Sequence, residues 1–274
     1  SALARRQRRQ RALQQQRLQR HAARHDSDKA HTGETDVELA AELTRQLEKG
    51  GALRQEALRR LSEPTLMRRL SFAPAGCRAV QLAFEVADRN SAAQVAAGLK
   101  GSVAEAIRSP NANYVVQKII TVLTPQEAPF IAEELQWAGP ALACHEYGCR
   151  IYCRLLENAA EDESTVRLID SALAEVDVLL THPFGHHVVE GVLEHGLARQ
   201  QGEIIPVLRK GVMRTANSRP GAYVLEKALL YSSLEDRRAL ASDLLVASPS
   251  EFAGLMRSQL GSMVIRAMLR SLPA

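Results

Sequence analysis

The sequence has few aromatic residues and no long apolar run. Phe, Trp and Tyr make up only 4% of its 274 residues. No stretch approaches the ~20 consecutive apolar residues that a membrane helix needs, so we expect no membrane among its partners. Hydrophobic residues at 46% and charged residues at 24% are near the globular averages, which excludes wholesale disorder and fits one large domain or two small ones. Because leucine and alanine abound while aromatic residues are rare, we expect a helical fold.

Cysteine is also scarce, and the motifs of nucleotide-binding and hydrolytic enzymes are missing from the sequence. The four cysteines, at positions 77, 144, 149 and 153, make no convincing disulfide framework, which favours a reducing compartment. The sequence contains neither a Gly-rich phosphate loop nor a nucleophile elbow. We therefore predict that the protein is not an enzyme and that it uses no cofactor and no small-molecule substrate.

Acidic residues are absent from the first 25 positions, which hold eight arginines. Subtracting these eight charges from the formal net charge of +4 leaves −4 for residues 26–274, so the basic character belongs to the N-terminal segment. We predict that residues 1–34 form a disordered, Arg- and Gln-rich basic tail. Two interpretations stay open: a non-specific polyanion-binding arm or nuclear address, and a solvated leader or isolated helix.

The structured region is predicted to begin at Thr35. Thr35 and Glu38 have the spacing of a capping box, and two consecutive glycines follow the next apolar-periodic stretch. We expect one helix over 36–49, a second over 52–61, and a single repeat domain over 35–274. The first of these helices would be a degenerate repeat that caps the domain.

A repeat of about 36 residues is the strongest signal in the chain. Six similar segments begin at intervals of 36, 36, 37, 36 and 40 residues, a period typical of solenoids. The start positions are Cys77, Asn113, Cys149, His186, Ala222 and Ser262.

Two features of each segment predict a helix packed against its neighbours. A small residue precedes every start, which lets the helix begin close to neighbouring backbone. Apolar pairs follow two and three places, and again six and seven places, after each start, and this spacing forms a wide apolar stripe on a helix. Each repeat is therefore a helical hairpin or triplet, and stacking the repeats gives an all-α, curved α-solenoid of about six repeats.

The remaining positions predict a recognition face. The start position and the residues one and four places after it lie at 0°, about 100° and about 40° around a helix, and we expect them to form an exposed face opposite the apolar stripe. In chain order the triples are Cys77-Arg78-Gln81, Asn113-Tyr114-Gln117, Cys149-Arg150-Cys153, His186-His187-Glu190, Ala222-Tyr223-Glu226 and Ser262-Met263-Arg266. Five of the six middle residues are planar, which suits stacking on unpaired bases, and amide pairs can hydrogen-bond base edges.

At these residues the chain resembles the Pumilio (PUF) family of single-stranded RNA-binding proteins. The resemblance covers about residues 52–274 and is carried by NYVVQK at 113–118, YGCR at 147–150 and HVVEGVLEHG at 187–196. It implies that each repeat reads one base with its triple, and that the RNA runs antiparallel to the protein. Members of the family usually carry eight repeats, and six are recognised here.

The resemblance assigns bases to some triples only. The first triple matches the adenine triple of the family and the second matches its uracil triple. The third begins as an adenine triple, but Cys153 stands where Gln is usual. The fifth keeps Glu226 of a guanine triple and has Ala222 in place of Ser. The fourth and sixth match no standard triple.

The resemblance further implies sequence-selective binding of single-stranded RNA in untranslated regions of mRNA, and post-transcriptional regulation of transcripts with regulatory protein partners. The expected location is the cytoplasm, with the nucleus or nucleolus as an alternative. Two rival functions stay open: a helical-repeat scaffold that binds a protein, and a low-specificity RNA binder in ribosome biogenesis. Non-standard triples in four of six repeats and the charge of −4 on residues 26–274 favour the scaffold.

Two groups of possible metal ligands are discounted at this stage. A helix brings His186 and Glu190 together, but His195 falls elsewhere and no fourth ligand is evident. Cys149 and Cys153 share a helix face near Cys144 and His145, but the repeat register already explains Cys149. We therefore predict no metal site.

Overall fold

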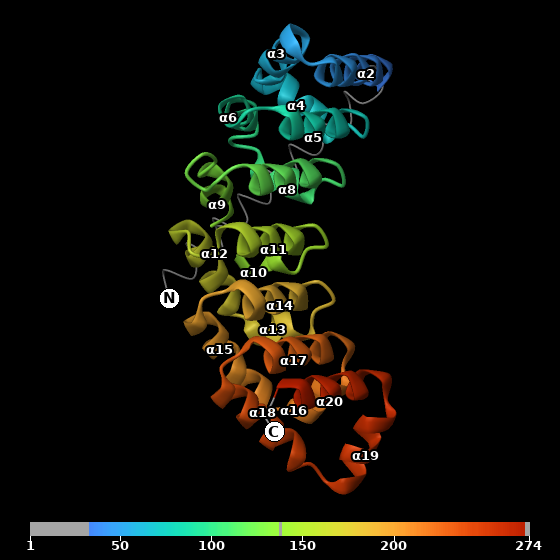
Figure 1. Ribbon diagram of the computed structural model, residues 1–274, viewed down its shortest axis with the longest axis vertical. Coiled ribbons are helices and arrows are strands. Elements are labelled where there is room, and N and C mark those ends of the chain that lie inside the picture. The colour runs from blue at the N-terminus through green and yellow to red at the C-terminus, as the bar shows by residue number, and fades with distance from the viewer. Residues whose placement is uncertain (1–32, 137–138, 272–274) are drawn as a thin grey trace, which may run out of the picture.

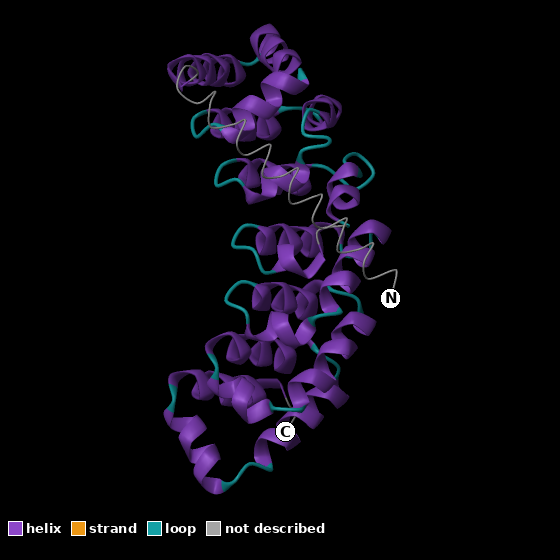
Figure 2. Ribbon diagram, turned by 180° about the vertical axis from the view of Figure 1, so that it is seen from behind, coloured by secondary structure: helices purple, strands orange, loops and turns teal. Residues whose placement is uncertain are grey.

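The computed structural model describes residues 33–136 and 139–271, and every regular element in these ranges is a helix. The helices form an elongated stack (Figure 1), and helices and loops account for all of its described parts (Figure 2). No described helix has the length and apolar character that crossing a bilayer requires. The predicted basic tail, residues 1–34, falls almost entirely outside the described residues.

Each repeat contributes three helices, so the helical triplet is the correct alternative of the two predicted. An inner row contains the six predicted segments: α5 (Gly76–Val86), α8 (Ala112–Val122), α11 (Gly148–Ala159), α14 (Gly185–His195), α17 (Arg219–Tyr231) and α20 (Gln259–Ser271). An outer row consists of α3 (Gly51–Leu61), α6 (Arg89–Ala97), α9 (Phe130–Leu135), α12 (Glu163–Leu173), α15 (Ala198–Arg209) and α18 (Leu234–Leu245). Short connecting helices lead into the inner row: α4 (Pro64–Phe72), α7 (Val103–Arg108), α10 (Gly139–Ala143), α13 (Val176–Thr181), α16 (Val212–Asn217) and α19 (Pro249–Arg257).

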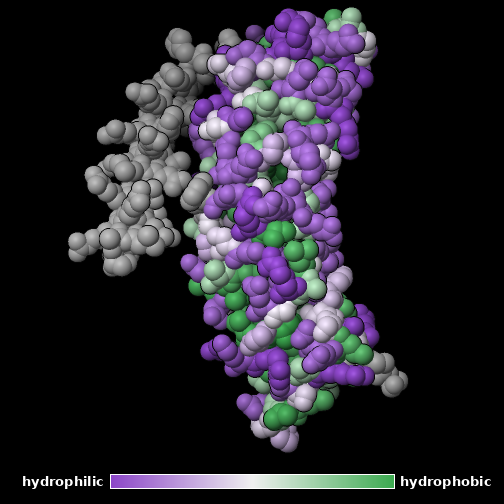
Figure 3. Space-filling model, turned by 90° about the vertical axis from the view of Figure 1, so that its left-hand side faces the viewer, coloured by the Kyte–Doolittle hydropathy of each residue, from purple (hydrophilic) through white to green (hydrophobic). Residues whose placement is uncertain are grey.

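The inner helices pack side by side in chain order, which confirms the solenoid. The stack is bowed, and in Figure 1 its two ends reach further to the right than α11 and α14 do. The opposite side, formed by the outer row, is mainly hydrophilic near the N-terminal end, and hydrophobic residues gather over its other half (Figure 3).

The paired apolar positions of the inner helices are buried as predicted, with one exception. Val80, Val116 and Tyr152, in three successive helices, are all 0% exposed. Leu269, the last of these positions, is 69% exposed in the final helix. Buried side chains from both ends of the described chain form one continuous hydrophobic cluster, so each repeat covers the apolar face of the next.

The small residue before each start allows close backbone approach, also as predicted. A Cβ atom added to Gly76 would lie 2.4 Å from the carbonyl oxygen of Leu70, and one added to Gly148 would lie 2.1 Å from that of Leu142. Both distances are far inside van der Waals contact. In α8 the same place holds Ala112, which is fully buried, so this position requires a small side chain in every inner helix. The space is tightest at Gly148 and Gly261, where an added Cβ would lie 2.1 Å from a carbonyl oxygen.

The first helix, α2 (Gly33–Lys49), packs against α5 and extends the inner row at the N-terminal end (Figure 1). Its end at two glycines is confirmed: Gly50 and Gly51 have φ values of 76° and 56°, in the left-handed region that glycine adopts without strain. The position of α2 fits the predicted role of a cap, because it covers the apolar face that α5 would otherwise expose.

Candidate nucleic-acid interface

The middle residues of the triples are accessible along the whole inner row, as predicted. Four of them are exposed and the last two are half-buried. In chain order they are Arg78, Tyr114, Arg150, His187, Tyr223 and Met263. Since consecutive inner helices are in contact, this column places a planar group on each of five neighbouring helices.

The first residues of the triples are buried, and here the prediction of one exposed face is wrong. Asn113 is 0% exposed, Cys149 is 2% exposed and His186 is 7% exposed. The cause is angular, because the residue seven places after the start lies only ~20° from the start around the helix. The start position therefore borders the apolar stripe and faces the neighbouring helix. Ser262 is the one first residue that is half-buried.

The second triple is held together by its own hydrogen bonds. The Gln117 side chain donates from Nε2 to Oδ1 of Asn113 over 2.9 Å. Asn113 in turn donates from Nδ2 to the backbone carbonyl of Ser109 over 2.8 Å. The amide orientations follow from this network. The arrangement leaves Gln117 half-buried with a free carbonyl oxygen and a second N–H, which is a matched acceptor and donor for the edge of a base. Tyr114 beside it is 44% exposed.

The first and third triples share a buried thiol at the start position. Cys77 donates from Sγ to the carbonyl of Pro74 over 3.3 Å, and Cys149 makes the same contact with Glu146 over 3.6 Å. Burial raises the pKa of both thiols, so both remain neutral near pH 7. In the first triple Gln81 donates from Nε2 to the Cys77 carbonyl over 3.0 Å.

Cys153, in the place where the third triple would carry Gln, is another neutral thiol. Burial first, and then the neighbouring Cys149, raise its pKa to about 12. Its Sγ lies 3.5 Å from the backbone carbonyl of His187 in the next repeat. The third triple therefore offers no amide to a base edge, and its one strongly polar accessible group is Arg150.

The fourth triple brings three titratable side chains together. The ligand atoms of His186, His187 and Glu190 all lie within 4.8 Å of one another, so the three residues that the triple predicts on one helix face do lie together. The rings of His186 and His187 have centroids 4.0 Å apart, and His186 lies parallel to Tyr223 of the fifth triple with centroids at 6.4 Å.

The last two triples are the least suited to reading a base edge. Ala222 is fully buried and offers no side-chain polar group, which leaves the half-buried Glu226 without a partner at the start of the fifth triple to position it. In the sixth, exposed Arg266 folds back on its own helix and donates from Nε to the Ser262 carbonyl over 3.1 Å.

Comparisons with known proteins identify the repeats. The model of the Pumilio-family RNA binding repeat matches residues 70–96, 108–136, 140–170, 178–206 and 221–245. These five matches cover the repeats of α5, α8, α11, α14 and α17, and the segment containing α20 is not among them.

Individual relatives agree with the repeat model. The chain is 26% identical over 209 residues to Pumilio homolog 12 of Arabidopsis thaliana, which spans 76% of this chain and 35% of that protein. It is 28% identical over 123 residues to Pumilio homology domain family member 4 of Saccharomyces cerevisiae, spanning 43% of this chain and 14% of that protein. The solved Puf3 RNA binding domain, bound to a Cox17 RNA 3′ UTR recognition sequence, superposes with a TM-score of 0.77 at 23% identity, over 86% of this chain and 74% of that one. The chain thus spans about a third or less of the length of these two curated relatives.

Proposed function

The chain belongs to the Pumilio family of RNA-binding repeat proteins, and we propose that it binds single-stranded RNA along its inner row. The observation that carries the proposal is the accessible planar column on successive, packed helices. Bases can stack on or between these side chains whatever their identity, while the amide groups beside them meet base edges. The first residue of each triple is buried. The side chain four places after it therefore makes the main contact with the base edge, and the first residue holds that side chain in position.

The base order of the site follows from the triples that match the family. With RNA antiparallel to the protein, the first two triples select 5′-UA-3′ at the 3′ end of the site. The third selects an A just upstream, more weakly, because Cys153 replaces the amide. The remaining triples contribute stacking by His187 and Tyr223 more than base selection.

A role in post-transcriptional regulation rests on the same proposal. The Puf3 domain of similar fold is bound to a 3′ UTR recognition sequence, which makes the untranslated regions of cytoplasmic mRNA the target class we propose for this chain. Regulatory protein partners would act on the bound transcript from surfaces away from the inner row.

The rival function is a repeat scaffold whose inner row holds a protein, and the weak fifth and sixth triples favour it. In vitro selection from a random RNA pool, with the whole chain as bait, distinguishes the two. We expect enrichment of single-stranded sites containing UA. Enrichment of no common sequence would favour the scaffold or a low-specificity RNA binder.

Replacing Tyr114 by Ala should weaken binding to all RNA sequences by about 1–3 kcal/mol, because stacking is nearly independent of base identity. Tyr231→Ala is the matched control, since Tyr231 is equally exposed at 44% but lies outside the six triples. Fluorescence anisotropy with RNAs that differ at one base would show a uniform loss for Tyr114→Ala and little change for the control. A loss confined to one base would contradict the stacking role.

Deleting residues 1–34 should reduce the salt dependence of RNA binding and leave base preference intact. The eight arginines in this segment can neutralise phosphates, and each neutralised phosphate on a single strand contributes a slope of about −0.7 in log K against log salt. Titrations at several salt concentrations measure the slope. If base preference disappeared together with the segment, the repeats would not be the part that reads sequence.

A further inference from the structure

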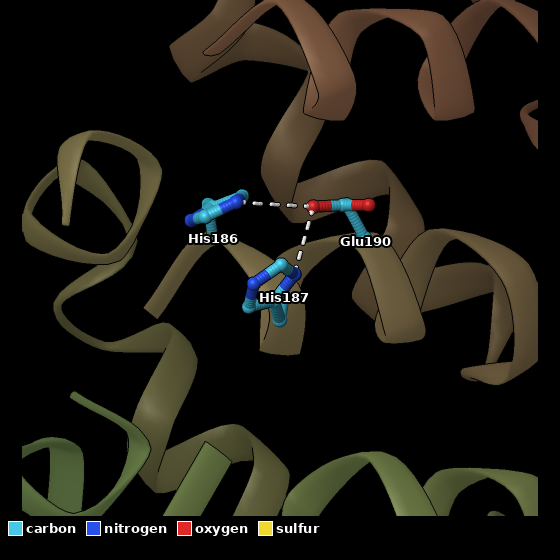
Figure 4. Close-up of side chains that lie close together, drawn as sticks. All are labelled: His186, His187 and Glu190. Carbon is cyan, nitrogen blue, oxygen red and sulfur yellow. Dashed lines mark ion pairs between the residues drawn. The ribbon is translucent and has the colours of Figure 1, made fainter. Parts of the chain in front are cut away.

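Helix α14 carries a compact group of three possible metal ligands, namely His186, His187 and Glu190. Oε1 of Glu190 lies 3.5 Å from Nε2 of His186 and 3.4 Å from Nδ1 of His187. All three ligand atoms lie within 4.8 Å of one another. Figure 4 shows both rings and the carboxylate turned towards one point.

Hydrogen bonding fixes which nitrogen of His186 faces Glu190. Nδ1 of His186 lies 2.9 Å from the backbone carbonyl of His182, and a carbonyl only accepts, so Nδ1 carries the hydrogen. The neutral ring therefore directs the lone pair of Nε2 at the carboxylate. Metal-binding histidines commonly donate their second N–H to a backbone carbonyl in the same way.

One oxygen of the Glu190 carboxylate is left without a donor. Oε1 of Glu190 is buried and accepts no hydrogen bond. The carboxylate oxygen of Glu190 and the Nε2 atom of His186 are both acceptors, and they face each other in a partly buried site. A cation between them would bind to both atoms.

We propose that His186, His187 and Glu190 bind a divalent transition-metal ion of the Zn²⁺ class. Ligands held 2.0–2.2 Å from a tetrahedral ion lie about 3.3–3.6 Å apart, and both measured separations from Glu190 fall in this range. Two imidazoles and one carboxylate also form a known type of zinc site, in which the fourth position stays open to solvent or to a ligand. The ligand group borders the accessible side of the inner row, since half of the His187 side chain is exposed.

The side chains nearest in charge and chemistry to the three ligands do not occupy the position proposed for the ion. Lys227 of α17 acts electrostatically on Glu190, but its ammonium is paired with Glu194 and does not fill the site. The Cys153 thiol is directed at the backbone carbonyl of His187, 3.5 Å away, and is not part of the ligand group. The ligands come from one helix, so the site needs no movement between repeats to form.

Cobalt tests the proposal, because tetrahedral Co²⁺ absorbs visible light and Zn²⁺ displaces it. The whole chain should develop this absorption on titration with CoCl₂ and lose it on addition of ZnCl₂. His187→Ala and Glu190→Gln should each weaken binding by more than the roughly 10- to 100-fold that loss of an outer-shell partner costs. His195→Ala is the control, because this exposed histidine shares the helix but lies outside the group.

Circular dichroism establishes that the variants fold, and His187 is exposed, so its removal leaves the core intact. Absence of the absorption in the parent chain, or its persistence in both ligand variants, would overturn the proposal. The titration contains no RNA, so its outcome is independent of whether the inner row binds RNA.

Discussion

Changing Asn113 to Ser and Gln117 to Glu is expected to switch the preferred base at one RNA position from U to G. In the parent chain the Asn113–Gln117 hydrogen bond leaves one acceptor and one donor, which complements the edge of uracil. A carboxylate at 117 only accepts and therefore complements the two adjacent donors on the Watson–Crick edge of guanine. Since one base-specific contact is worth roughly 1–3 kcal/mol, losing one and gaining the other changes the preference by about 2–6 kcal/mol.

The switch is measured by the affinities of parent and double mutant for four RNAs that differ only at that base. Tyr114 stays in place, so the stacking contribution is the same for both proteins. Preferences at the other positions are the internal control and should not change. A double mutant that still prefers U would show that the second triple does not read this base.

Gly148→Ala and Gly202→Ala should have opposite effects on stability. An added methyl group at Gly148 meets the carbonyl oxygen of Leu142 at 2.1 Å, so α11 must move away from α10, and overpacking of this kind costs about 1–3 kcal/mol or more. At Gly202, an exposed position inside α15, nothing lies within 4 Å of the added atom. There the change only improves helix propensity, by up to about 1 kcal/mol.

Urea denaturation followed by circular dichroism compares the two variants with the parent. We expect the midpoint to fall for Gly148→Ala and to rise for Gly202→Ala. If the two variants had equal midpoints, the first residues of the inner helices would tolerate a larger side chain. That result would contradict the close packing of connecting and inner helices.

The repeat architecture could be predicted from the sequence because it depends on local periodicity. A constant interval and paired apolar positions predict packed helices, and the burial of Val80, Val116 and Tyr152 confirms them. The exposed Leu269 departs from the pattern because it lies in the last described helix, where no further described repeat covers it.

The geometry of the site could be predicted only in part. Exposure of the middle residues of the triples follows from their angle to the apolar stripe. The burial of Asn113 depends instead on the residue two helical turns further along and on the neighbouring helix. The approach of His187 to Glu190 depends on side-chain rotamers, which the sequence pattern does not contain. The base preferences of the triples remain predictions.

One measurement tests the central claim most directly: the affinity of the unmodified chain for four single-stranded RNAs that differ only at the base opposite the Asn113 triple. We predict that the RNA with U binds more tightly than the other three by about 1–3 kcal/mol, or about 5- to 150-fold. Equal affinity for all four would contradict base reading by the inner row and would favour the scaffold function.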